Sequence, residues 1–246
     1  MVDPASIERY RTASAELSGR VEAELAAYFA ALDLSRPEAA RNALLEFMPL
    51  LVSQYGEVAG VLALDWYEEQ RADSGVAGRF RATPAPAAIP SVRVEEKVRY
   101  LARHLWTPEP AAMLSALTIA TDKYVKQSGR NTITWNADRE GASWARVPSG
   151  PKTCSWCLIL ASRDAVYVSE KSAETRADGE TYHGFCDCQA VPLRAGDDYP
   201  EGYLPDDFYD MYSVARDAAG SGDMKDIAAA MRREFPGSVT DGVHTH

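Results

Sequence analysis

The spacing of the cysteines constrains the fold of this chain more than any other feature of its sequence. All four cysteines lie in the second half, as a C-x-x-C pair followed further along by an H-x-x-C-x-C pattern. Thiolates two or three residues apart on a tight turn can reach one ion, and zinc takes four sulfur or nitrogen ligands in a closed tetrahedron. The pattern therefore predicts one structural zinc ion. Its candidate ligands are Cys154, Cys157, His183, Cys186 and Cys188.

The sequence leaves other states of these groups open. The cysteines could instead form disulfides or a redox pair, or stay free thiols. One of the five groups could also contact a metal-binding residue instead of binding the ion itself. Residues 1–12 contain Asp3, Glu8 and two arginines and no apolar core segment, so a secretory signal is not expected. In a reducing compartment this spacing favours a metal over disulfides.

The composition is that of a soluble globular protein. Of the 246 residues, 46% are hydrophobic and 25% are charged, and the formal net charge is −10. Such acidity argues against broad, non-specific binding to nucleic acid, although it permits a local basic patch. Glu46 and Pro49 interrupt the longest apolar stretch, residues 43–52, and no run reaches about 18 apolar residues. We therefore expect no membrane partner.

Residues 1–82 are predicted to form a module of long helices. Apolar residues between positions 7 and 32 recur three, four or seven apart, which lines one face of a helix. A second helix is expected from a capping box at Ser35 and Glu38, with Pro37 just inside its start and a kink at Pro49. The apolar faces could form an intramolecular core or an arm that packs on another subunit.

Residues 83–91 are predicted to be an extended, proline-rich linker, and residues 92–141 a helical connector. Three helices are expected in the connector, at residues 92–105, at 108–124 after a cap at Thr107, and at 131–139. From its middle onward, over residues 123–152, the chain is locally basic, which fits a solvated helix face or a contact with nucleic acid or an acidic partner. The basic residues are Lys123, Lys126, Arg130, Arg139, Arg146 and Lys152.

Residues 142–194 are predicted to be a small metal-clipped α+β module. Short segments rich in Val, Tyr or Trp predict strands at residues 142–148, 165–169 and 189–193, with a helical turn at 158–162. Few large apolar residues lie inside the module, so metal binding would supply much of its folding free energy. An acidic tail, residues 195–246, should hold helices at 206–218 and 223–235. The predicted fold class is therefore α+β, mainly helical.

Three segments of the chain resemble the Mu F-like minor head protein family of tailed phages, in particular its members from actinobacterial phages. They are residues 150–157 (GPKTCSWC), the strand-like residues 165–167 and residues 182–192 (YHGFCDCQAVP), and the resemblance covers residues 131–193. The chain departs from the family pattern in having Asp187 between the last two cysteines and a longer loop at 170–181.

The resemblance implies a protein built into the phage head in few copies, near the portal. Its expected partners are the portal protein or the major capsid protein, with packaged DNA as a further one. Its expected location is the virion, after synthesis in the host cytoplasm. Some relatives are labelled head-maturation proteases, which makes a capsid maturation protease the alternative function.

The residues themselves favour a structural and interaction role over an enzyme. A cysteine protease built from Cys154 and His183 is the one arrangement that supplies a nucleophile and a base, and it would leave three thiols without a role. A zinc nucleobase deaminase needs a His-x-Glu motif, whereas His104 is followed by Leu-Trp. A nucleic-acid-binding zinc module, with tryptophans stacked on bases, is the remaining alternative. The tryptophans concerned are Trp135, Trp144 and Trp156.

Overall fold

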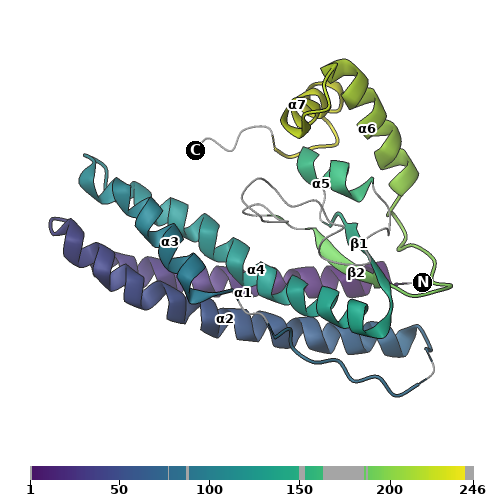
Figure 1. Cartoon of the computed structure of the whole chain (residues 1–246), viewed down its shortest axis with the longest axis horizontal. Coiled ribbons are helices and arrows are strands. Elements are labelled where there is room, and N and C mark those ends of the chain that lie inside the picture. Colours follow the sequence, from purple (N-terminus) through teal and green to yellow (C-terminus); the bar gives the residue numbers. More distant parts are fainter. Residues whose placement is uncertain are drawn as a thin grey trace.

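The structure, a computed structural model of the chain, describes residues 2–76, 78–86, 89–149, 153–162, 186 and 188–241. It is mainly helical with a small antiparallel sheet, which confirms the predicted class. The shorter helix α3 (Ser91–Leu101) and the 3₁₀ helix η1 (Ala102–Trp106) lie against the long helices. Figure 1 shows three long helices side by side: α1 (Pro4–Ala30), α2 (Pro37–Asp73) and α4 (Ala112–Glu140).

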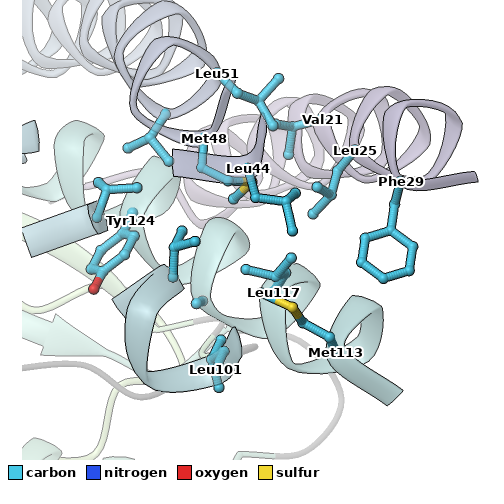
Figure 2. Close-up of a cluster of buried hydrophobic side chains, with 14 of the residues drawn as sticks. Val21, Leu25, Phe29, Leu44, Met48, Leu51, Leu101, Met113, Leu117 and Tyr124 are labelled. Carbon is cyan, nitrogen blue, oxygen red and sulfur yellow. The ribbon is translucent and has the colours of Figure 1, made fainter. Parts of the chain in front are cut away.

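The apolar faces of these helices meet in one cluster, which we call the helical core. Its side chains come from α1, α2, α3, η1 and α4, so the faces bury one another within the chain. Figure 2 shows side chains from four of these helices converging. The labelled residues are Val21, Leu25, Phe29, Leu44, Met48, Leu51, Leu101, Met113, Leu117 and Tyr124. The three-four spacing of α1 and α2 therefore serves an intramolecular core.

The start of α2 differs from the predicted capping box. The residue that caps it is Arg36, without a side-chain hydrogen bond, because the Ser35 hydroxyl donates to the Asp33 carboxylate instead. Pro37 does occupy the first turn, where the missing N–H costs nothing. The helix extends through Pro49 as one element.

α4 also differs from the prediction, because residues 108–124 and 131–139 belong to one helix. It begins at Ala112 rather than after Thr107, whose hydroxyl accepts a hydrogen bond from the Glu109 N–H. Buried side chains continue through the middle of the helix, from Val125 to Ile133, so packing holds it together where the sequence pattern weakens. At its end Gly141 adopts a left-handed conformation, with φ 73°.

The three long helices come close together at Gly129 of α4. A Cβ placed there would lie 2.8 Å from the Tyr10 hydroxyl oxygen and 3.2 Å from the carbonyl oxygen of Ala59. Tyr10 is buried and stacks on Trp66, with ring centroids 4.8 Å apart. A glycine is therefore needed where α1 and α2 cross α4.

The described part of the proline-rich segment is extended but docked along α4. The Thr83 N–H donates to Asn136 Oδ1, and Asn136 Nδ2 donates back to the Thr83 carbonyl, at 2.9 and 2.8 Å. The Ala85 N–H donates to the Thr132 hydroxyl. Because the helical core contains residues from both sides of this segment, independent folding of residues 1–82 stays a prediction.

The strands predicted at residues 142–148 and 189–193 are confirmed. β1 (Ser143–Val147) pairs antiparallel with β2 (Gln189–Leu193), with Trp144 opposite Pro192. Their apolar side chains join a second cluster with residues of α1, α2 and α4, so the sheet packs on the ends of the long helices. The strand predicted at residues 165–169 lies outside the described residues.

A buried ion-pair network ties the sheet to these helices. Glu140 at the end of α4 accepts hydrogen bonds from Arg71 on α2, from Arg194 after β2 and from the Tyr67 hydroxyl. Burial alone would raise the pKa of Glu140, but the hydrogen bonds from Tyr67, Arg194 and Arg71 outweigh it and lower the pKa below its ordinary value. The carboxylate is thus held in its charged form.

The C-terminal helices form a third group around α5 (Ser155–Ala161). α6 (Pro205–Ala219) and α7 (Met224–Glu234) confirm the two helices predicted in the tail, and α5 agrees with the predicted helical turn. Leu158 and Ile159 of α5 pack against Ala215, Ile227 and Met231. The segment after the first cysteine pair is therefore buried against the tail.

Among the described helices, α2 is long and apolar enough to cross a membrane by length and composition alone. Its buried side chains lie in the helical core and in the second cluster, as expected of a core helix. The absence of a membrane partner stays a prediction.

Candidate metal centre

The four cysteines form one buried cluster where α4, α5 and the start of β2 meet. Cys157, Cys186 and Cys188 are at most 2% exposed, Cys154 is 9% exposed, and Trp156 packs against the group. The Sγ atoms of Cys157, Cys186 and Cys188 all lie within 4.8 Å of one another. The structure thus brings together four of the five predicted ligands. The fifth, His183, lies outside the described residues.

The first cysteine pair is shaped by the start of α5. Cys154 is extended, with φ −71° and ψ 152°, and caps the helix through its Sγ, which accepts a hydrogen bond from the Cys157 N–H at 3.3 Å. The chain turns into the helix between the two residues, so both side chains enter the same buried cluster.

The second pair is held from the side of α4. Cys188 directly precedes β2, and the guanidinium of the buried Arg130 donates to the carbonyl oxygens of Cys186 and Cys188. The expectation of a solvated basic face is wrong for Arg130 and Arg146, because both are buried, at 2% and 0% exposure. Lys123 and Lys126 are half-buried, so Arg139 is the exposed one among the described basic residues named for that face.

The C-terminal segment holds the first pair from the other side. The Asp241 carboxylate accepts hydrogen bonds from the Ser155 N–H and hydroxyl, and Arg232 on α7 donates to the same carboxylate at 3.0 Å. The Thr240 N–H donates to the Thr153 carbonyl. Burial would raise the pKa of Asp241, but the bonds from Ser155 and Arg232 lower it. An anion thus sits at the start of α5, where the helix dipole favours it.

Sequence reasoning missed both Arg130 and Asp241 as parts of this centre. Arg130 lies in a run of basic residues that resembles a surface helix, and Asp241 lies near the end of an acidic tail. Their position in sequence gives no sign of contact with the cysteines, because each contact spans more than 50 residues. The one available signal is the apolar spacing of α4, which places Arg130 next to the buried Ile133.

The cluster fits a tetrahedral thiophilic ion. Ligands about 2.3 Å from zinc lie roughly 3.8 Å from one another, and the Cys157 and Cys186 sulfurs are 3.2 Å apart, within reach of that arrangement and too far for a disulfide. None of the four cysteines forms a disulfide in this structure. Hydrogen bonds with Cys154 and Cys186, together with burial, raise the pKa of the Cys157 thiol. A bound cation would have to displace that proton.

Comparison with known proteins assigns the chain to the proteins of bacteriophages. It is 31% identical over 121 residues to the Gene 15 protein of Mycobacterium phage D29, a match that covers 37% of this chain and 44% of that protein. It is 30% identical over 122 residues to the Gene 15 protein of Mycobacterium phage L5, which covers 34% of this chain and 42% of that protein. The matches therefore span less than half of these relatives.

The family model described as VG15 protein matches residues 1–215. Because the match covers most of the chain, this protein belongs to the VG15 protein family. The match includes helices α1 to α4, which we call the helical body, together with all four cysteines and most of α6. It ends before α7 and Asp241. No solved structure matches the chain.

Proposed function

We propose that this protein is a minor component of the head of a tailed phage, with a structural and interaction role near the portal, and that its cysteine cluster holds one structural zinc ion. Kinship with mycobacteriophage gene products supports the phage setting. The resemblance of the cysteine-rich segments to Mu F-like minor head proteins supports the head. The buried thiol cluster carries the structural role.

The zinc proposal rests on where the thiols lie. Cys157, Cys186 and Cys188 would supply three ligands, and Cys154 or His183 the fourth. Bound zinc would cross-link α5 to Cys186 and Cys188 and, through Arg130, to α4. Closed tetrahedral sites of this kind are structural, whereas a catalytic zinc keeps an open position for water or substrate. Burial of all four sulfurs favours the closed type.

The structure separates buried from exposed apolar residues along α2. Trp66 is 4% exposed and donates to the Ser6 hydroxyl, so it serves the core rather than a partner. Three apolar residues of α2 face outward instead: Leu50, Val58 and Val61 are 70%, 43% and 51% exposed. Their spacing of eight and three residues puts them on one side of the helix. We propose this stripe as the contact with the portal or the major capsid protein.

Complementation tests this proposal. A phage that lacks the gene is supplied with wild-type protein, with Val61→Asp or with Val92→Asp, and its purified heads are assayed for the protein. Val92 is a matched control because it is 54% exposed, on α3. We expect wild type and Val92→Asp to enter heads and Val61→Asp to be depleted. Equal incorporation of all three would remove the stripe from the proposal, and absence of the wild type from heads would refute the head location.

The maturation protease alternative is tested by a separate cleavage assay. Purified wild-type protein is incubated with the major capsid protein, beside folded Cys154→Ala and His183→Ala variants. Cleavage by wild type that both variants lose would replace the structural role by a proteolytic one. We expect no cleavage by any of the three.

A further inference from the structure

Arg130 is a charged side chain in a place where a charge is costly. It lies in the middle of α4 and is 2% exposed. A buried guanidinium is tolerated only when hydrogen bonds and compensating charge replace the water it has lost. The partners of Arg130 therefore indicate what this charge does.

Within the described residues, the hydrogen bonds of Arg130 go to the candidate metal centre. Arg130 Nη2 donates to the carbonyl oxygens of Cys186 and Cys188, and Nε donates to the Cys188 carbonyl at 3.2 Å. One planar guanidinium group therefore hydrogen-bonds to the backbone of both Cys186 and Cys188. A guanidinium suits this task because its donors are fixed in a fork, whereas a lysine ammonium is a single flexible point charge.

The same cation is hydrogen-bonded to the backbone of two residues whose thiols become anionic when a metal binds. Zinc requires its cysteine ligands as thiolates, and three or four thiolates on one divalent ion leave a net negative charge. An arginine keeps its positive charge at every physiological pH. A fixed cation close to a buried, thiolate-rich centre lowers the cost of that net charge.

We propose that Arg130 is a positioning residue of the metal centre: it fixes Cys186 and Cys188 through their backbone carbonyls and offsets the negative charge of the metal-bound thiolates. This role rests on the zinc site proposed above. It assigns to α4 a direct part in metal affinity, so the helical body and the cysteine-rich module share one centre.

The test compares full-length wild type with Arg130→Gln, Arg130→Lys and Arg71→Gln. Arg71 is the control because it is a partly buried arginine that pairs with Glu140 and not with the backbone of the cysteines. Zinc affinity is measured by competition with a chromophoric chelator, and the cobalt-substituted proteins are compared by their thiolate-to-cobalt absorption bands. Loss of outer partners of a metal site typically lowers affinity by about 10–100-fold.

We expect Arg130→Gln to lose affinity in that range and to show altered cobalt bands, and Arg71→Gln to keep both properties even if it unfolds at lower temperature. Arg130→Lys keeps the charge but not the fork, so it should lose less affinity than Arg130→Gln. If Arg130→Gln does not fold, Arg130→Lys decides: wild-type affinity and wild-type bands in that variant would overturn the role. Absence of stoichiometric zinc from the wild type would instead overturn the metal site itself.

Discussion

Replacement of Gly129 by alanine tests how closely the long helices approach one another at that residue. In an open helix, alanine in place of glycine stabilises by about 1 kcal/mol. At Gly129 the added Cβ would meet the Tyr10 hydroxyl at 2.8 Å and the Ala59 carbonyl oxygen at 3.2 Å. Tyr10 stacks on Trp66, and the Ala59 oxygen belongs to the backbone of α2. Neither group can therefore move without disturbing the packing around it.

Gly19 provides a matched control. It also lies inside a long helix, α1, but a Cβ there would have nothing within 4 Å. The gain in helix propensity is common to both substitutions, so the difference between them isolates the cost of overpacking. That cost is typically about 1–3 kcal/mol. We expect Gly19→Ala to be more stable than wild type, and Gly129→Ala to be less stable than Gly19→Ala by that amount.

The assay is urea unfolding of the full chain, monitored by circular dichroism. The free energies of unfolding are compared with the same dependence on urea concentration for all variants. Equal stabilisation by the two substitutions would show that the helices do not approach as described at Gly129. A rise for Gly19→Ala and a fall for Gly129→Ala would support the crossing.

Further predictions concern the network, the metal module and the linker. Glu140→Gln should weaken the dependence of stability on pH at acidic pH. A carboxylate with a lowered pKa stabilises the fold above about pH 4.5 and loses that contribution as the pH falls. Thermal unfolding at several pH values measures this dependence. Cys154→Ser should loosen the region after residue 142 and leave the helical body folded, as read by hydrogen exchange. Asp241→Asn should speed amide exchange in α5, whereas the exposed Asp226→Asn should not. Limited proteolysis should cut first between residues 79 and 90, and cuts confined to the C-terminal tail would contradict the predicted linker.

Local patterns were sufficient where one face of an element is buried against a regular neighbour. The three-four spacing around Leu17, Val21 and Leu25 predicted α1, and the Trp- and Val-rich stretch at residues 143–147 predicted β1, because burial alone decides which side chains those positions carry. The helical turn predicted at residues 158–162 is present as α5, although the helix begins earlier, at Ser155, with Cys154 as its cap.

Contacts across long sequence distances were not predictable in the same way. Arg130 was assigned to a solvated face because local basic residues give no sign of the carbonyl groups that it meets 56 and 58 residues later. A break in α4 was expected because the apolar pattern weakens at Ser128 and Gly129. The expectation was wrong because these residues are small where α2 packs against them. Tertiary packing overrode local propensity at both places.

The central claim is that the cysteine cluster of this phage protein holds one structural zinc ion. Elemental analysis of protein purified without added metal, combined with a thiol count after denaturation, tests it most directly. The account predicts one zinc per chain and four reduced cysteines, with zinc lost when Cys157 is replaced by serine. A well-folded, metal-free protein with two disulfides would contradict it.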